Sequence, residues 1–197
     1  MTRRADGTSP LDLGRACLVV TGAPGAGKST VSRAVAAALS RSALVEAYIV
    51  SGMVVSGHVW ALGEPADEAA RQIRLCHENL CALATNLANA GFTPVIDVVV
   101  PDLANLDGFR SALGDRLRLV VLDPGTDVCV SRNATRPPIE QFFFDGYDGL
   151  HATMQTGFGG LGWWLDTSAQ TCDETVEQLL THADERARVE PLATLRT

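Results

Sequence analysis

The stretch TGAPGAGKST, Thr21 to Thr30, decides the fold. It contains Lys28, the only lysine among the 16 Lys and Arg residues of the chain. Gly22, Gly27, Lys28 and Ser29 have the G-x-x-x-x-G-K-S spacing of a phosphate-binding P-loop. An apolar run precedes this stretch and a segment with helical periodicity follows it, which is the strand–turn–helix context that the motif requires.

The chemistry of such a loop explains its residue types. Glycines allow successive backbone N–H groups to point at one anion, and the N-terminus of the following helix adds partial positive charge. Lys28 is expected to reach the β- and γ-phosphates, the Ser29 hydroxyl to bind Mg²⁺, and Thr30 to assist at the α-phosphate. The predicted nucleotide-binding residues of the loop are Gly22, Ala23, Pro24, Gly25, Ala26, Gly27, Lys28, Ser29 and Thr30.

The solitary lysine also bears on which nucleotide binds. Guanine recognition in the common GTPases needs an Asn-Lys-x-Asp motif, and no lysine other than Lys28 is present to form one. The sequence therefore favours ATP over GTP and disfavours a Ras-like switch.

Composition narrows the class of partner and the compartment. A chain of 197 residues with 46% hydrophobic residues is the size of one globular domain. Its net charge of -7 argues against nucleic acid as the main partner, because phosphate neutralisation needs a basic surface. The five cysteines show no C-x-x-C spacing, and we find no signal peptide and no apolar run of membrane-spanning length. We expect a cytoplasmic protein that does not bind membranes.

Apolar runs alternate with segments of helical periodicity along the chain. Expected strands lie at residues 16–22, 43–50, 93–101, 117–124 and 161–168; expected helices lie at 28–39, 67–90 and 103–113, with a last helix that Thr171 and Glu174 open as a capping box and that ends near residue 186. This alternation predicts an α/β protein with a five-stranded parallel sheet, covered by helices on both faces as a three-layer α/β/α P-loop NTPase fold. Ligands of such folds bind at the carboxyl ends of the strands.

The same reading divides the chain into segments. Residues 1–15 are expected to be a flexible N-terminal tail, residues 16–186 the P-loop domain, and residues 187–197 a C-terminal tail. Residues 132–147 are expected to form a small lid. Arg132 and Arg136 are four residues apart, so on a helix both would point to one side.

In the order and spacing of its motifs, the chain resembles the small P-loop kinases of the nucleoside monophosphate kinase fold. Among these kinases it most resembles the chloramphenicol phosphotransferase-like family. The resemblance runs over about residues 16–185. It rests on TGAPGAGKST, on GFTPVIDVVV, on the two arginines and on WLDTSAQTCDETVEQLL. It implies transfer of the γ-phosphoryl group of ATP, with Mg²⁺, to a hydroxyl of a small molecule. It also implies that Arg132 and Arg136 clamp the moving phosphoryl group or stack on adenine, whereas outside this context they would be surface arginines.

Two positions, Asp97 and Ser51, matter for the question of which group accepts the proton of the acceptor hydroxyl. Asp97 interrupts an apolar strand, and a buried carboxylate is costly unless it is paired or faces a ligand. The resemblance implies a place for Asp97 near Mg²⁺ or as general base, with a structural role as the alternative. Family members carry a proton-accepting aspartate near the end of the second strand, where this chain has Ser51 in IVSGMV. Three explanations are open for the missing aspartate. Asp97 accepts the proton in its place, or the acceptor hydroxyl reacts with less assistance from a base, or the protein does not phosphorylate a hydroxyl.

The acceptor is expected to bind between the second strand, the start of the long helix and the lid. Predicted substrate-binding residues there are Ser51, His58, Arg71 and Arg74. Met53 and Trp60 in the same region suggest a partly apolar acceptor, such as an antibiotic or other secondary metabolite.

Two other functions stay open. A nucleoside or nucleotide kinase would use Arg71 and Arg74 to hold an acceptor phosphate. A nucleotide-binding regulator without transferase activity would need no acid at Ser51. The expected partners are a nucleotide and a small-molecule acceptor, with a homodimer left open.

Overall fold

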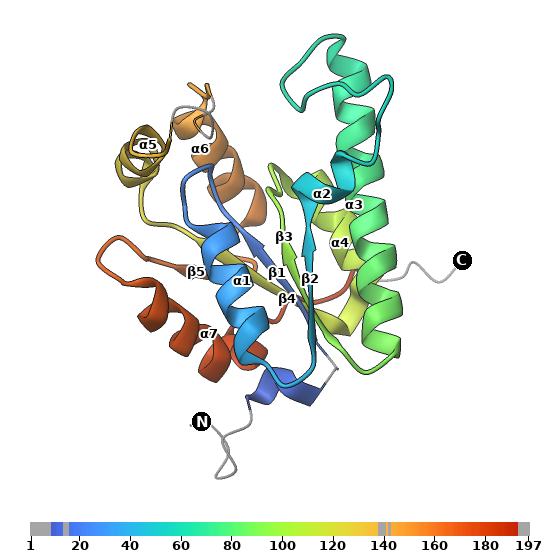
Figure 1. The fold of residues 1–197 in the computed structure, drawn as a ribbon, viewed down its shortest axis with the longest axis vertical. Coiled ribbons are helices and arrows are strands. Elements are labelled where there is room, and N and C mark those ends of the chain that lie inside the picture. The colour runs from blue at the N-terminus through green and yellow to red at the C-terminus, as the bar shows by residue number, and fades with distance from the viewer. Residues whose placement is uncertain (1–8, 14–15, 138–140, 142, 193–197) are drawn as a thin grey trace.

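The computed structural model describes residues 9–13, 16–137, 141 and 143–192 (Figure 1). Its centre is a sheet of five parallel strands in the order β2-β3-β1-β4-β5. The strands are β1 (Cys17–Thr21), β2 (Ser42–Glu46), β3 (Thr93–Asp97), β4 (Leu117–Leu122) and β5 (Trp163–Leu165). The predicted α/β class and the five-stranded parallel sheet are confirmed.

Seven α-helices and two short 3-10 helices complete the described part of the chain. They are η1 (Pro10–Leu13), α1 (Lys28–Ala38), α2 (Ala47–Ser51), α3 (Ala66–Asn89), α4 (Leu103–Leu113), η2 (Gly114–Arg116), α5 (Thr126–Ala134), α6 (Tyr147–Phe158) and α7 (Cys172–Arg186). The capping box of Thr171 and Glu174 opens α7 as predicted. None of these helices combines the length and the apolar character that crossing a membrane demands, over the part of the chain that the structure describes.

Alternate residues of the central strand feed two hydrophobic cores. Leu18 and Val20 of β1 face a core that contains residues of α1 and α7. Cys17 and Val19 face the opposite core, which contains residues of α3, α4 and α6. Figure 1 shows these helices on the two sides of the sheet. Because both faces of β1 are buried, its sequence is a continuous apolar run instead of an alternating one.

The second strand is shorter than predicted. The expected strand at residues 43–50 ends at Glu46, and residues 47–51 form the short helix α2. The side chains of Tyr48 and Ile49 are 85% and 55% exposed, so this apolar stretch leaves the sheet instead of extending it. The third strand likewise ends at Asp97, before the residues up to 101 that the apolar run suggested. Both overestimates arise because apolar residues continue past the point where pairing stops.

The expected common helix of the two lid arginines is wrong. Helix α5 ends at Ala134, so Arg132 lies in its last turn and Arg136 lies beyond it. The backbone N–H of Arg136 donates to the carbonyl of Asn133 in a turn, and Pro137, which favours an extended residue before it, follows directly. Residues 138–140 and 142 of the expected lid lie outside the described residues.

The expected tails are partly incorporated into the domain. Residues 1–8 and 14–15 lie outside the described residues, but Leu11 of η1 is only 1% exposed and accepts a hydrogen bond from Thr93. At the other end, Ala187 and Val189 are buried, and Arg188 forms an antiparallel bridge with Arg118 beside β4. The core therefore extends beyond the predicted limits of 16 and 186 at both ends.

Candidate functional site

The glycine-rich turn joins β1 to α1 at the carboxyl edge of the sheet. Gly22, Gly25 and Gly27 have φ values of 144°, 82° and 100°, which L-residues with a side chain rarely adopt. A Cβ added at Gly22 or Gly25 would collide with the carbonyl oxygen of Leu122 or Cys129. The turn is thus packed against the end of β4 and against α5 and leads directly into the N-terminus of α1, a placement that fits a phosphate cradle.

Lys28 is folded into this cradle. Its Nζ donates to the carbonyl oxygens of Gly22 and Ala23, both at 3.0 Å. Burial lowers the pKa of Lys28 to about 8, while the nearby Asp97 carboxylate opposes that shift. Neutral carbonyls compensate poorly for burying an ammonium group, whereas a phosphate would supply full negative charge at this position. Ser29 and Thr30 are exposed in the first turn of α1, where their hydroxyls can meet a ligand.

Two carboxylates lie side by side at the same edge. Glu46 and Asp97 are the last residues of β2 and β3, and the strand register pairs them directly. Asp97 is also paired with Val20 of β1, next to the P-loop. Asp97 is 8% exposed, and its charge acts on the pKa of Lys28. Asp97 is therefore a buried carboxylate at a strand end beside the P-loop strand.

Glu46 is the acid that the sequence analysis missed. Its Oε1 accepts from Nη2 of Arg33 at 2.8 Å, and its side chain is 17% exposed. Ser51, which was aligned with the family's aspartate, lies instead at the end of α2, where its hydroxyl donates to the carbonyl of Tyr48. The strand ends at Glu46, four residues before the expected end at residue 50, so Ser51 lies in α2 and not at a strand end. A usable signal was the match between LVE and VID, two apolar residues followed by an acid, in the two strands.

Arg132 bridges the P-loop and the segment after β5. Its Nη1 donates to the carbonyl of Ala26 and its Nη2 to the carbonyl of Thr167, both at 3.2 Å. Arg136 lies close enough for its charge to lower the pKa of Lys28. Both arginines therefore lie beside the P-loop although they do not share a helix. The buried Thr167 hydroxyl has no hydrogen-bond partner among the described residues.

A cavity of about 280 Å³ begins at Ala47 and Val98, the residues that follow the two acids, and neither Glu46 nor Asp97 lines it. It is bounded by α2, the loop after it, α3 and the residues that follow β3, and both Ser51 and His58 line it. Arg71 does not line it, because its guanidinium binds Glu68 through two bonds of 2.7 and 2.9 Å. The structure thus brings two of the four predicted substrate-binding residues to this cavity.

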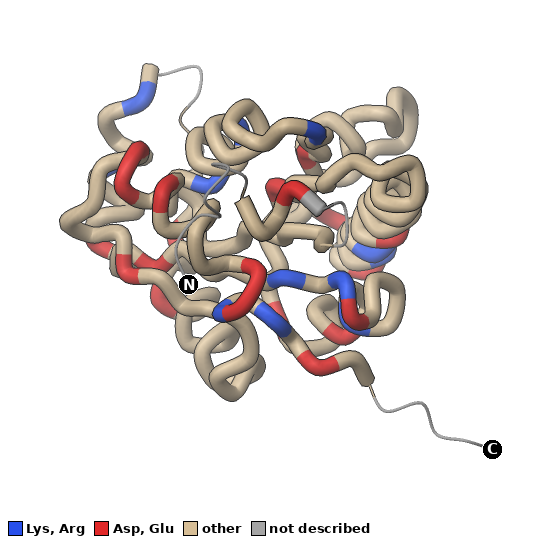
Figure 2. Tube along the Cα trace, turned by 90° about the horizontal axis from the view of Figure 1, so that it is seen from below, with Lys and Arg blue, Asp and Glu red and all other residues tan. Residues whose placement is uncertain are grey.

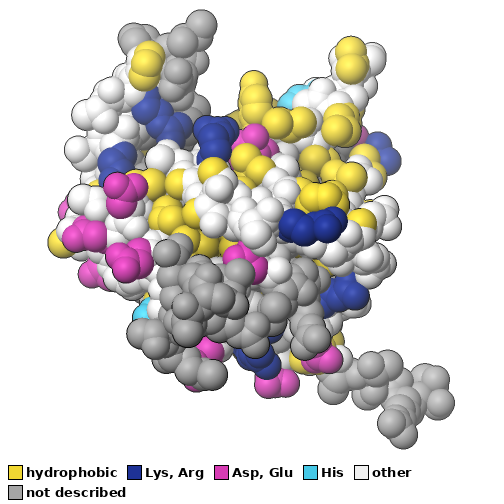
Figure 3. Space-filling model, turned by 60° about the horizontal axis from the view of Figure 1, so that its bottom comes forward, with side chains coloured by type: hydrophobic (Ala, Val, Ile, Leu, Met, Phe, Trp, Pro, Cys, Tyr) yellow, Lys and Arg dark blue, Asp and Glu magenta, His cyan; other side chains and the backbone are white. Residues whose placement is uncertain are grey.

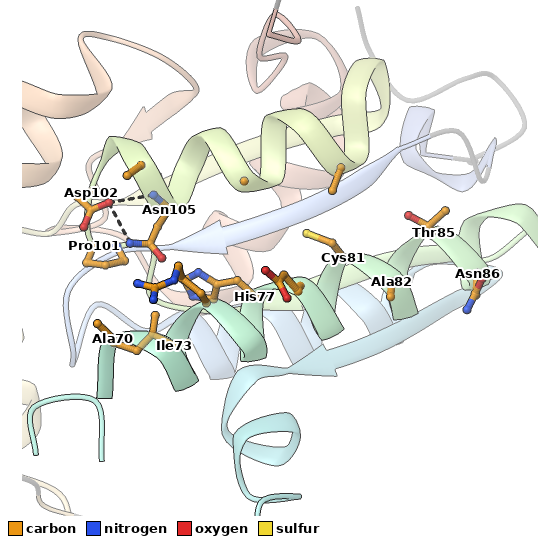
Figure 4. Close-up of a pocket in the computed structure, with 15 residues that line it drawn as sticks. Ala70, Ile73, His77, Cys81, Ala82, Thr85, Asn86, Pro101, Asp102 and Asn105 are labelled. Carbon is orange, nitrogen blue, oxygen red and sulfur yellow. Dashed lines mark hydrogen bonds between the residues drawn. The ribbon is translucent and has the colours of Figure 1, made fainter. Parts of the chain in front are cut away.

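The fourth residue, Arg74, lines a separate cavity of about 720 Å³ between α3 and α4. Figure 4 shows this second cavity, with His77 between the two helices and Asp102 bonded to Asn105. His77 is buried against Phe109, and burial lowers its pKa. Arg74 lines this cavity and does not line the 280 Å³ one, although Ile73, His77 and Pro101 line both.

A further acid–histidine pair was not anticipated. Asp123 follows β4, and its Oδ1 lies 2.9 Å from Nε2 of His151 on α6. The sequence analysis assigned no role to Asp123. The pair joins α6 to the strand end next to the P-loop.

A five-stranded parallel sheet with a glycine-rich turn after its central strand defines a P-loop protein of the α/β class. The model of a protein family described as an AAA domain matches residues 18–160, which is more than half of the chain. The chain belongs to this family. No curated protein matches it.

Three solved structures illustrate the similarity of fold. A sugar kinase from Janibacter sp. HTCC2649 has a TM-score of 0.61 and 18% identity, over 84% of this chain and 92% of that one. The tunicamycin resistance protein of Deinococcus radiodurans has a TM-score of 0.59 and 18% identity, over 89% and 98%. Shikimate kinase from Acinetobacter baumannii in complex with shikimate has a TM-score of 0.58 and 15% identity, over 84% and 91%. At these identities the likeness establishes the fold.

Proposed function

We propose that the protein is an ATP- and Mg²⁺-dependent kinase that transfers the γ-phosphoryl group to a hydroxyl of a small molecule. The observation that carries this proposal is the placement of Glu46 and Asp97 at adjacent strand ends beside the P-loop strand, with a cavity that begins at the residues following them. A P-loop alone supports nucleotide binding, whereas transfer also needs a place for the acceptor and a group to receive its proton. Two structures of similar fold are named as a sugar kinase and a shikimate kinase, which agrees with this reaction class.

The two carboxylates receive different roles because of the strand order. Strand β3 is next to β1, so Asp97 is the acid closer to the phosphates and to Ser29. Strand β2 is one strand further out, and the residue after Glu46, Ala47, lines the cavity. We assign Asp97 and the Ser29 hydroxyl to Mg²⁺ and its water ligands, and Glu46 to accepting the acceptor's proton.

The metal would depend mainly on the nucleotide. Among the described residues, no three His, Cys, Asp or Glu side chains gather so as to hold a metal ion. Mg²⁺ in kinases is commonly held by phosphates and water with one or two protein oxygens, so a site of Ser29 and Asp97 fits that chemistry. When bound, the ion would neutralise charge on the β- and γ-phosphates.

The positive groups stabilise the transferred group. Lys28 and Arg136 act on the P-loop from two sides, and Arg132 ties Ala26 to Thr167. Charge on the equatorial oxygens of the moving phosphoryl group needs cations held in place beforehand. The adenine is assigned to the segment 166–168, which follows β5.

The alternatives fit less well. A nucleotide kinase acting on a phosphorylated acceptor would need Arg71 and Arg74 in the acceptor cavity, but Arg71 is bound to Glu68 and Arg74 lines another cavity. A nucleotide-binding regulator was considered because no acid was found at the end of the second strand, and Glu46 occupies that place. An antibiotic or other secondary metabolite stays our proposal for the acceptor, and a nucleic acid partner is not expected. In the view of Figure 2, acidic and basic residues are interspersed along the described chain.

The test is incubation with ATP, Mg²⁺ and a pooled set of hydroxylated metabolites and antibiotics, followed by mass spectrometry for products that gain one phosphoryl group. The wild-type protein is expected to form such a product, and Lys28→Ala is expected to form none. Tight ATP binding without any phosphorylated product would reject the kinase assignment, and equal turnover by Lys28→Ala would reject the role of the P-loop.

A further inference from the structure

The cavity of about 720 Å³ between α3 and α4 has no part in the proposed reaction. Small residues form most of its α4 wall, because Ala104, Gly108 and Ala112 recur every four residues and share one side of that helix. Their short side chains leave an open slot between the two helices. The face in Figure 3 also carries hydrophobic side chains, gathered along its upper part, so an apolar lining alone does not mark a ligand site.

Two buried polar atoms of this lining have no hydrogen-bond partner among the described residues. They are Nδ1 of His77, whose residue is 8% exposed, and Oδ1 of Asn105. Figure 4 shows the two side chains next to each other, at the end of the cavity where Pro101 and Asp102 lie. Nδ2 of Asn105 donates to Oδ1 of Asp102 at 2.9 Å, which fixes the orientation of the amide. A ligand that bonds to both atoms would remove the cost of leaving them unpaired.

The buried groups at this end of the cavity are uncharged. Burial lowers the pKa of His77, and the neighbouring side chain of Asn105 and backbone of Val99 only oppose that shift. The imidazole is therefore neutral at neutral pH. The charged side chains of the described lining are Arg74, Glu78 and Asp102. One guanidinium beside two carboxylates offers an anion no net positive charge, and it also repels a cation, so the lining favours an uncharged ligand.

We propose that the cavity between α3 and α4 binds an uncharged aromatic molecule that carries a hydroxyl group. A hydroxyl is both donor and acceptor, so it donates to Oδ1 of Asn105 and accepts from Nδ1 of His77, which carries the imidazole proton. The flat ring lies in the slot against the small residues of α4. The volume of about 720 Å³ lies within the range of roughly 300–1,000 Å³ that is common for ligand sites. This inference does not depend on kinase activity.

The experiment measures the binding of three probes with the same ring system, 2-naphthol, naphthalene and 2-naphthoate. Saturation-transfer NMR titrations at neutral pH, without nucleotide, give the three Kd values. We expect 2-naphthol to bind at least about tenfold more tightly than naphthalene, because its hydroxyl bonds to the two unpaired atoms. We also expect it to bind more tightly than 2-naphthoate. Equal Kd values for 2-naphthol and naphthalene would overturn the inference, as would a preference for 2-naphthoate.

Two asparagines at opposite ends of the cavity locate the hydroxyl (Figure 4). Asn105→Leu removes the unpaired oxygen but keeps the backbone N–H that donates to Asp102 at the start of α4. It is expected to weaken 2-naphthol binding at least about tenfold, to the level of naphthalene. Asn86→Leu makes the same chemical change at the far end and is expected to leave the Kd within about twofold. Equal losses in the two variants would contradict the proposed orientation.

Two helical glycines test whether the cavity itself is the site. A Cβ added at Gly108 of α4 or at Gly149 of α6 meets no atom within 4 Å, so both helices have room for a side chain. Gly108→Trp fills the slot and is expected to abolish binding of 2-naphthol, whereas Gly149→Trp is expected to leave it unchanged. Retained binding in Gly108→Trp would reject the location. Sedimentation tests the other occupant: a wild-type dimer that Gly108→Trp alone makes monomeric would show that a second copy covers the cavity, and would overturn the inference.

Discussion

Glu46 and Asp97 are paired residues at the ends of neighbouring parallel strands, so two carboxylates lie side by side next to the P-loop. Register in a parallel sheet fixes this relationship, because each side chain's position follows from the pairing of its strand. Strand order then makes the two acids inequivalent, because β3 lies next to β1 and its P-loop whereas β2 lies one strand further out.

The first prediction concerns this division of roles. Glu46→Gln keeps the shape of the side chain but removes its ability to accept a proton. We expect kcat to fall by roughly 10²–10⁴, the usual contribution of a general base, with the Kd of ATP within about threefold. Steady-state kinetics and equilibrium binding of ATP measure the two effects. A kcat within about threefold of the wild type would assign proton transfer to another group.

Asp97→Asn supplies the comparison for that variant. It is expected to raise the Mg²⁺ concentration that gives half-maximal activity, because Asp97 is assigned to the metal and its waters. Glu46→Gln is expected to leave that concentration unchanged. The reverse pattern would exchange the two roles.

The second prediction concerns the protonation of Lys28. Burial lowers its pKa from the usual 10.5 to about 8 in the folded chain. Bound phosphates favour the charged ammonium and raise that pKa again. Above pH 8, ATP binding is therefore expected to take up protons, and affinity is expected to weaken as pH rises toward 10. Calorimetry at pH 9 in buffers of different ionisation enthalpy measures the uptake. Lys28→Met is the control, and identical uptake in this variant would contradict the assignment.

The same pKa fixes the sign of a stability effect. Between about pH 8 and 10.5 the unfolded chain binds more protons at Lys28 than the folded one. The free energy of unfolding without nucleotide is thus expected to receive an increasing contribution from this group as pH rises through that window. Comparing wild type with Lys28→Met by urea unfolding at pH 7.5 and 9.5 isolates the contribution.

The third prediction concerns Arg132. One guanidinium bonds both Ala26 and Thr167, which the single ammonium of a lysine cannot reproduce in the same geometry. Arg132→Ala is expected to lower kcat by about 10² or more, with little rescue by Arg132→Lys. Arg41→Ala, an exposed arginine beside Phe92, is the control and is expected to have no effect. Full activity of Arg132→Lys would show that charge alone suffices.

The fourth prediction concerns stability away from the site. Arg118 is 5% exposed, and Asp184 accepts two of its hydrogen bonds at 3.0 and 2.8 Å. Asp184→Ala leaves a buried guanidinium without its carboxylate and is expected to cost about 2–3 kcal/mol of unfolding free energy. Urea unfolding measures this loss. Glu68→Ala removes an exposed ion pair and is expected to leave the midpoint nearly unchanged. Similar midpoints for both variants would contradict the buried pair's contribution.

The sequence predicted the parts of the fold that depend on local patterns. Glycine spacing identified the turn around Lys28, apolar periodicity located α3 and α4, and the capping box located the start of α7. Strand ends were harder, because pairing partners decide where a strand stops. The apolar residues after Glu46 and Asp97 concealed both ends, and the sequence analysis therefore did not consider Glu46 at the end of β2.

Contacts between distant segments could not be predicted from local patterns. The bonds of Arg132 to Ala26 and Thr167 join residues 106 and 35 positions apart. Arg71 and Arg74 seemed suitable for an acceptor phosphate because both lie near the start of the long helix. In the structure Arg71 binds Glu68, and Arg74 lines the cavity between α3 and α4. These contacts depend on how α4 and the loop after α2 pack against α3, which local sequence patterns do not show.

The most direct test of the account follows the γ-phosphoryl group of ATP by ³¹P NMR in the presence of Mg²⁺ and the pooled set of hydroxylated metabolites and antibiotics. The account predicts that a phosphate monoester appears at the same rate as ADP, and that neither forms with Lys28→Ala. Release of inorganic phosphate without any monoester, or no ADP although ATP binds, would contradict the central claim that this P-loop site transfers phosphate to a small-molecule hydroxyl.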